Sequence, residues 1–135
     1  MSILGPTLSL TTAEAFATKY LAAVYDASGT IVKATDPLIS GGEQFAGIVQ
    51  ISAASGDRVA VVKWGYSKAI AGAALTRGTH GPLMIDSGAA GRLVPATAGN
   101  VVVAYWHCDG DAKADGDEID VFVTGGMPYT LDTDT

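Results

Sequence analysis

The chain has 135 residues, of which 48% are hydrophobic and only 16% are charged, and its formal net charge is −6. This length fits one domain with one core, and so few charges exclude a disordered chain and a charge-rich helical protein. The eight basic residues are scattered among fourteen acidic ones. They disfavour nucleic acid and anionic membranes as partners, because both attract clustered Lys and Arg.

The N-terminal residues carry no secretion signal by this interpretation, since a basic region is missing and Gly5-Pro6 interrupts the apolar stretch. A single cysteine cannot form an internal disulfide. No apolar run approaches the roughly 18 residues that a membrane span needs. We therefore expect a soluble protein made in a reducing cytoplasm.

Residues 1–18 are predicted to form an extended N-terminal arm. The apolar side chains near its start are too many for a solvated tail and lack helical spacing, and a proline discourages burial in a central strand. We expect these side chains to pack against something outside the domain. The residues predicted to make this contact are Ile3, Leu4, Pro6, Leu8 and Leu10.

The second half of the arm carries a helix-start pattern. Thr11 and Glu14 have the spacing of a capping box, in which Glu14 would reach back to the Thr11 backbone. This pattern favours a helical turn that ends at about Lys19.

Nine short apolar runs separated by turn residues fill residues 19–124. They are Tyr20–Tyr25, Thr30–Ala34, Phe45–Ile51, Arg58–Trp64, Tyr66–Ala71, Leu83–Asp86, Arg92–Ala96, Val101–His107 and Ile119–Thr124. Such runs, with turn residues about every 8–12 positions, are typical of a β-sandwich or a small barrel. We predict an all-β domain over residues 19–124, a small antiparallel β-barrel or sandwich, followed by a C-terminal tail over residues 125–135. Apolar residues on both faces of Arg58–Trp64 further predict a strand covered on both sides.

The acidic segment Asp109–Glu118 resembles a calcium loop only superficially. An EF-hand needs Gly at its sixth position and Glu at its twelfth, and here those positions hold Ala114 and Asp120. The sequence favours a solvated hairpin loop, and adventitious cation binding remains the alternative.

Catalytic and zinc-binding patterns are equally incomplete. His107 and Cys108 are adjacent, so in a strand their side chains point to opposite faces and do not meet. A zinc site built from His80, His107 and Cys108 lacks a fourth ligand. We expect no enzymatic activity, no metal and no cofactor.

Four large aromatic residues in predicted strands are candidates for a protein interface. Tyr105 and Trp106 are neighbours, so one of the two is expected to lie outside the core. Aromatic side chains at exposed positions of a strand favour protein interfaces. The candidates are Trp64, Tyr66, Tyr105 and Trp106.

The order of several short segments carries a family resemblance over about residues 19–123. The segments are Lys19–Val24, Asp26–Val32, Phe45–Val49, Ala54–Val61, Gly65–Leu75, Leu83–Asp86, Gly91–Ala96 and Gly116–Val123. In this order they resemble the capsid decoration proteins of tailed phages, which are also called head-stabilising or cement proteins.

The resemblance implies a structural virion protein without catalytic residues, made in the host cytoplasm. Such a protein binds the outer surface of an icosahedral phage capsid and stabilises the expanded shell by bridging subunits of the major capsid protein. It also implies a homotrimer, with a dimer or a monomer as alternatives. The rival interpretation is a β-barrel carbohydrate- or ligand-binding module displayed on a particle or a cell surface. A small hydrolase is disfavoured because no catalytic constellation is visible.

Overall fold

The computed structural model describes residues 7–37, 39, 44–76, 81–97, 99–106 and 113–124. These residues form ten strands and no helix, and accordingly they include no helix long and apolar enough to cross a bilayer. The strands are β1 (Thr7–Thr11), β2 (Ala22–Tyr25), β3 (Ile31–Lys33), β4 (Gln44–Val49), β5 (Arg58–Val62), β6 (Trp64–Ile70), β7 (Gly81–Ile85), β8 (Leu93–Pro95), β9 (Ala104–Trp106) and β10 (Glu118–Thr124).

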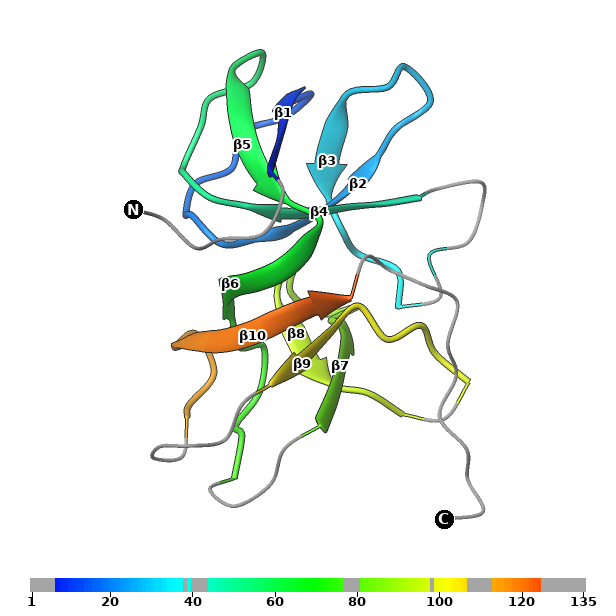
Figure 1. The fold of residues 1–135 in the computed structure, drawn as a ribbon, viewed down its shortest axis with the longest axis vertical. Coiled ribbons are helices and arrows are strands. Elements are labelled where there is room, and N and C mark those ends of the chain that lie inside the picture. The colour runs from blue at the N-terminus through cyan, green and yellow to red at the C-terminus, as the bar shows by residue number, and fades with distance from the viewer. Residues whose placement is uncertain are drawn as a thin grey trace.

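The strands pair antiparallel in two five-stranded sheets, of order β1-β5-β4-β2-β3 and β6-β10-β9-β7-β8 (Figure 1). Neither sheet closes on itself. The prediction of an all-β fold is therefore confirmed, and the architecture is that of a β-sandwich rather than a closed barrel. Each of the nine predicted strands is present, with ends that differ from the prediction by at most three residues.

One strand beyond the nine predicted, β1, lies within residues 1–18, which the sequence assigned to the arm. β1 pairs with β5 along its whole length, from Thr7 opposite Val62 to Thr11 opposite Arg58. Its sequence, Thr-Leu-Ser-Leu-Thr, alternates polar and apolar residues with the period of a half-buried strand. Residues 7–11 thus belong to the edge of the first sheet.

The predicted capping box and helical turn are wrong. The residues after β1 form isolated bridges instead, Thr12 with Ile31 and Phe16 with Ala53. The Glu14 carboxylate accepts a hydrogen bond from the backbone N–H of Lys33, at 2.7 Å, rather than from the start of a helix. Pairing with distant strands and burial of the Phe16 ring therefore override the local capping signal.

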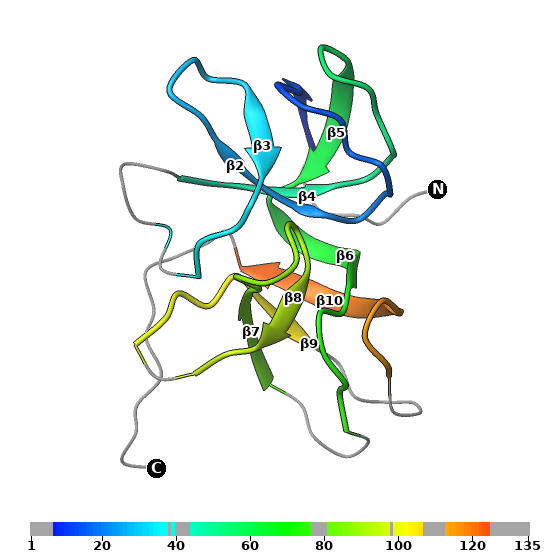
Figure 2. The same cartoon turned by 180° about the vertical axis from the view of Figure 1, so that it is seen from behind.

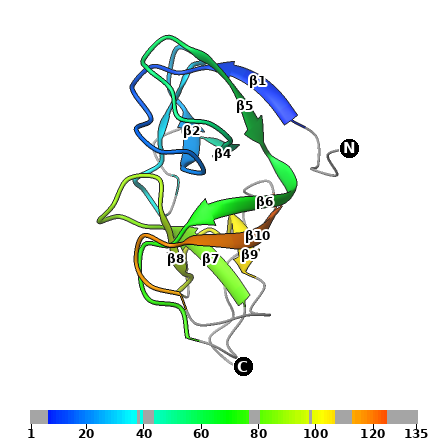
Figure 3. The same cartoon turned by 90° about the vertical axis from the view of Figure 1, so that its left-hand side faces the viewer.

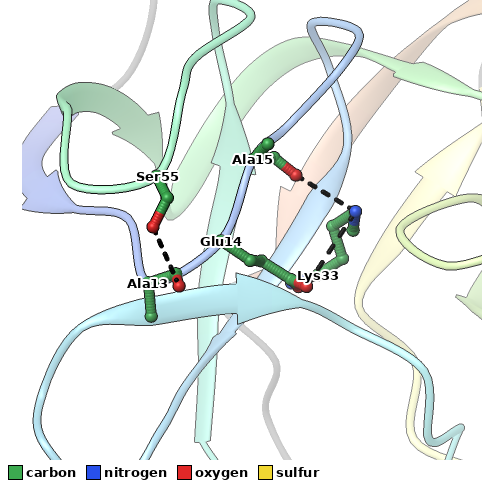
Figure 4. Close-up of polar contacts among 5 residues, drawn as sticks. All are labelled: Ala13, Glu14, Ala15, Lys33 and Ser55. Carbon is green, nitrogen blue, oxygen red and sulfur yellow. Dashed lines mark hydrogen bonds and ion pairs between the residues drawn. The ribbon is translucent and has the colours of Figure 1, made fainter.

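Side chains fix this segment to the first sheet, as Figure 4 shows. The Ser55 hydroxyl donates to the carbonyl of Ala13, at 3.2 Å, and the Lys33 ammonium donates to the carbonyl of Ala15, at 3.1 Å. The ammonium of Lys33 also lies 4.0 Å from the carboxylate of Glu14. The segment between β1 and β2 is consequently held over one face of the first sheet.

Two apolar cores result, one on each face of the first sheet. The core between the sheets contains residues from both, including Phe45, Ile48 and Trp106. The core of the first sheet lies on the other face and contains Ala46 and Val49 beneath the segment that carries Phe16. The strands covered on both faces are therefore β2 and β4.

The prediction of a doubly covered strand at Arg58–Trp64 is wrong for most of β5. Val59 and Val61 are buried in the core of the first sheet, but Ala60 on the opposite face is exposed. Only Val62 reaches the core between the sheets.

The chain itself and hydrogen bonds between loops join the two sheets. The chain passes directly from β5 into β6 through Lys63, a bend visible in Figure 3. The turn between β7 and β8 reaches the first sheet (Figure 2). There the N–H of Ala22 donates to the carbonyl of Gly91, and the N–H of Gly91 donates to the carbonyl of Ala34, each at 2.8 Å. Gly91 has φ +81° and approaches Leu21 so closely that an added Cβ would lie 2.8 Å from the Leu21 Cβ.

The junction between β5 and β6 also receives both ends of the described chain. Thr7, the first described residue, lies opposite Val62 at the end of β5. Thr124, the last described residue, lies opposite Trp64 at the start of β6. The two ends therefore leave the fold beside one another, on either side of Lys63.

Candidate functional site

The side of the second sheet that faces away from the core carries a cluster of aromatic residues. Burial alternates along β6, where Trp64 and Tyr66 are exposed while Gly65 and Ser67 are buried. The same alternation along β10 and β9 exposes Tyr105 and partly exposes Phe122. We call these four residues, Trp64, Tyr66, Tyr105 and Phe122, the aromatic face.

Strand register brings three of these residues into one row. Phe122 on β10 lies opposite Tyr66 on β6 and, on its other side, opposite Tyr105 on β9. Tyr105 in turn lies opposite Pro82 on β7. Residues directly opposite one another in neighbouring strands share a face and contact each other. The row therefore crosses four strands of the sheet.

The Phe122 ring fixes the positions of its two neighbours on β6. Its centroid lies 5.4 Å from that of Trp64 and 5.1 Å from that of Tyr66, with interplanar angles of 83° and 89°. Edge-to-face pairs of this kind are favourable beyond the area they bury. Yet 48% of Trp64, 55% of Tyr66 and 39% of Tyr105 remain accessible to solvent. These side chains are thus ordered by their neighbours and still available to a partner.

A charged strip borders the aromatic face on the same side of the same two strands. Lys68 donates a hydrogen bond to Asp120 at 3.1 Å, and Glu118 lies two residues before Asp120 on β10. The hydrogen bond to Asp120 raises the pKa of Lys68, and the charges of Asp120 and Glu118 add to the effect. With one cation and two anions, the strip is net negative.

The predicted interface candidates fall into two groups. Trp64, Tyr66 and Tyr105 lie on the aromatic face, whereas Trp106 is 5% exposed and belongs to the core between the sheets. The expectation that Tyr105 and Trp106 point to opposite sides is confirmed. Sequence reasoning missed Phe122. Its neighbours along β10, Val121 and Val123, are buried, so alternation along the strand places Phe122 on the outer side of the sheet.

The predicted contact residues of the arm are not all described. Ile3, Leu4 and Pro6 lie outside the described residues. Leu8 on β1 is 38% exposed, and Leu10 packs partly against the core of the first sheet. Leu8 is therefore available at the surface, whereas part of the Leu10 side chain is already used by the fold.

Within the described residues, no three His, Cys, Asp or Glu side chains gather as a metal site would require. His80, His107, Cys108 and residues 109–112 lie outside this part of the chain. In the described part of the acidic loop, the Asp117 carboxylate accepts from the N–H of Ala114, and Asp115 pairs with Arg92, each at 2.8 Å. These two carboxylates therefore serve the turn and an ion pair.

Comparison with known proteins identifies a similar fold. No family model matches the chain, and a search of curated proteins finds no match. Among solved structures, the chain is similar to the N base of the head fiber gp8.5 in bacteriophage phi29, with a TM-score of 0.62 and 14% sequence identity. The similarity covers 94% of this chain and 98% of that chain. At this level of identity the two proteins share a fold over nearly their whole lengths.

Proposed function

We propose that this chain is a structural protein of a phage virion that binds the outer surface of the head. The observation that carries the proposal is the similarity of fold to the base of a phage head fiber, which spans nearly all of both chains. The order of segments from Lys19 to Val123, which resembles capsid decoration proteins, supports the same role independently. The proposed function is non-enzymatic.

The finer role is to stabilise the expanded shell by bridging subunits of the major capsid protein, as a homotrimer. A protein that spans several subunits adds interface area at their junctions and needs no chemistry to do so. Linked copies bind a repeating lattice with a multivalent gain, even when each single contact is weak. An acidic chain with scattered basic residues also suits a protein partner better than the packaged DNA.

Co-sedimentation with expanded, DNA-free heads of the phage that encodes the chain tests this function. We expect saturable binding, and we expect decorated heads to resist heat better than bare heads. Bovine serum albumin at equal concentration serves as the control for trapped protein. Failure of the chain to sediment with heads at micromolar concentration would refute the proposal.

The sequence predicts an arm of residues 1–18, a decoration domain of residues 19–124 and a tail of residues 125–135; because β1 pairs with β5 and Phe16 is buried, residues 7–16 are part of the decoration domain. The contact residues proposed for the arm are Ile3, Leu4, Pro6, Leu8 and Leu10. Because β1 begins at Thr7, deleting residues 1–6 removes three of these residues and leaves the sheet intact. Burial of one Leu or Ile contributes about 1.5–3 kcal/mol, so we expect the deletion to weaken head binding by at least about tenfold after ordering costs. Unchanged binding would exclude an arm contact.

A carbohydrate-binding module is the second candidate function, and the half-exposed rings of Trp64 and Tyr66 favour it. Aromatic rings exposed on a sheet offer flat apolar surfaces on which sugar rings stack. Binding of the isolated protein to a glycan array, lost on Trp64→Ala, would support this function. If the same protein failed to bind heads, carbohydrate binding would replace the virion role.

A further inference from the structure

We propose that the aromatic face is the surface by which the chain docks on the head, against a protein surface that presents apolar side chains beside Lys or Arg. This inference rests on the proposed function and names the contact through which it acts. It assigns the principal contact to the second sheet, whereas sequence analysis named both the N-terminal arm and the large aromatic residues as candidate contacts.

The first argument is the composition and order of the face. Interface residues whose truncation costs most affinity are enriched in Trp and Tyr and lie in well-packed clusters. Trp64 and Tyr66 both pack edge-to-face against Phe122, so their rings are held before any partner arrives. A contact made by side chains that are already ordered loses less conformational entropy on binding.

The second argument is the exposed area of the aromatic face, which favours a partner in the capsid lattice over a second copy of this chain. A large aromatic side chain offers about 150–250 Å², and roughly half of Trp64, Tyr66 and Tyr105 is exposed. The three together expose roughly 300 Å², far below the roughly 800 Å² per partner of a stable isolated dimer. A patch of this size suits one contact among several on a repeating surface, where multivalency supplies the remaining affinity.

The third argument is charge. The strip next to the face has one cation, Lys68, already paired with Asp120, and the second anion, Glu118, is exposed beside them. The whole chain is also acidic, with a net charge of −6. A complementary partner therefore places Lys or Arg opposite Glu118 and apolar side chains against Trp64 and Tyr66.

The test compares one double substitution on the aromatic face with one single substitution outside it, in the head co-sedimentation assay. The variant Trp64→Thr/Tyr66→Thr removes two rings of the face and keeps a residue suited to strands. The control Ile51→Thr removes an apolar side chain of similar exposure, 50%, which lies outside the second sheet. We expect the double variant to bind heads at least about 30-fold more weakly, as for hot-spot residues, and the control to bind like the wild type.

A charge-reversing variant keeps the inference testable if the double variant does not fold. Glu118→Lys leaves the rings in place, and we expect it to weaken binding several-fold at low salt and less at high salt. Circular dichroism and melting temperature verify the fold of each variant, and sedimentation velocity without heads gives its oligomeric state.

The possible outcomes test the docking surface separately from the proposed virion role. If the wild type binds heads and a folded double variant binds equally well, the aromatic face is not the docking surface, but the virion role stands. If the double variant instead loses self-association in solution, the face is covered by a second copy and the inference is wrong. If the wild type does not bind heads, the proposed function fails and the inference fails with it.

Discussion

Gly47 lies next to a β-bulge in β4 that decides which of its neighbouring side chains enter each of the two cores. The pairing of β2 with β4 shifts register between Ala23 and Val24, so that Ala46 is an extra residue in a β-bulge. The bulge lets Phe45 and Ile48, three positions apart, both reach the core between the sheets. Gly47 itself has φ +131°, a conformation that other residues rarely adopt.

We predict that Gly47→Ala destabilises the fold by about 2–4 kcal/mol, since it adds backbone strain to a steric clash. An added Cβ would lie 2.5 Å from the carbonyl oxygen of Val62 and 2.6 Å from a methyl of Val61. Gly29→Ala is the matched control, because φ is +83° there but nothing lies within 4 Å of an added Cβ. Urea unfolding should give a smaller loss for Gly29→Ala, roughly 1–2 kcal/mol. Equal losses would mean that the clash at Gly47 relaxes.

Asp26 organises the turn between β2 and β3. Its carboxylate accepts hydrogen bonds from the N–H groups of Ser28 and Thr30, at 2.9 and 3.1 Å, and from the Thr30 hydroxyl at 2.7 Å. The Thr30 hydroxyl contributes most to lowering the pKa of Asp26 below its ordinary value of 3.8. A carboxyl whose pKa is lower in the folded state stabilises the fold above pH 3.8 and loses that contribution as the pH falls towards the folded pKa.

We therefore predict that Thr30→Val raises the pKa of Asp26 towards 3.8, as measured by NMR titration of the carboxyl group. The wild type should lose unfolding free energy more steeply than this variant as the pH falls below 3.8. Asp26→Ala serves as the control that removes the titrating group. An unchanged pKa in Thr30→Val would show that the backbone N–H groups dominate.

At the scale of elements, the segment between β1 and β2 covers the first sheet without being a strand or a helix. The segment also protects an edge of the first sheet, because β3 is the last strand of that sheet. The N–H of Lys33, which points away from β2, donates to the Glu14 carboxylate. Unpaired N–H groups at a sheet edge are a common site of aggregation. The contact thus fixes the segment and closes part of that edge.

We predict that Glu14→Ala lowers the unfolding free energy by about 1 kcal/mol, because it leaves the Lys33 N–H without this acceptor. Glu14→Gln keeps a carbonyl oxygen at the same position and should lose less. Thermal unfolding of the two variants and the wild type measures the difference. If Gln and Ala are equivalent, the ion pair with the Lys33 ammonium, at 4.0 Å, matters more than the backbone bond.

The sequence revealed the strands well because alternation and turn residues are local signals. It failed where distant contacts decide. The Thr11–Glu14 pattern is a valid local signal, but Phe16 gains more by burial in the core of the first sheet. β1 was assigned to the arm because its partner, β5, is some fifty residues away in the sequence.

The candidate site was recovered in part for the same reason. Alternation predicted that one of Tyr105 and Trp106 lies outside the core, and the structure shows that it is Tyr105. The row through Tyr66, Phe122 and Tyr105 depends on the register of three strands, which no local pattern contains. The bulge at Ala46 is likewise set by pairing between strands.

At the scale of the whole molecule, the two sheets behave as one structure because each supplies part of the other's packing. The core between the sheets contains Phe45 and Ile48 from the first sheet and Trp106 and Val121 from the second. The turn at Gly91 adds backbone hydrogen bonds to Ala22 and Ala34. We infer that the domain unfolds cooperatively rather than sheet by sheet.

Because both described ends lie at the junction of β5 and β6, the chain can be circularly permuted. Thr7 and Thr124 lie opposite Val62 and Trp64, so their separation is at most about 17 Å by strand spacing. Residues 125–135 followed by 1–6 supply ample length to connect them. We predict that a circular permutant, opened at Ser55-Gly56 and joined from Thr135 to Met1, folds to the same two sheets with a modestly lower melting temperature. Loss of the β-sheet circular dichroism spectrum would contradict this. The same geometry means that a peptide inserted directly before Thr7 or directly after Thr124 would emerge beside Trp64, next to the proposed docking surface, whereas one inserted at Ser55-Gly56 would emerge from the far end of β5.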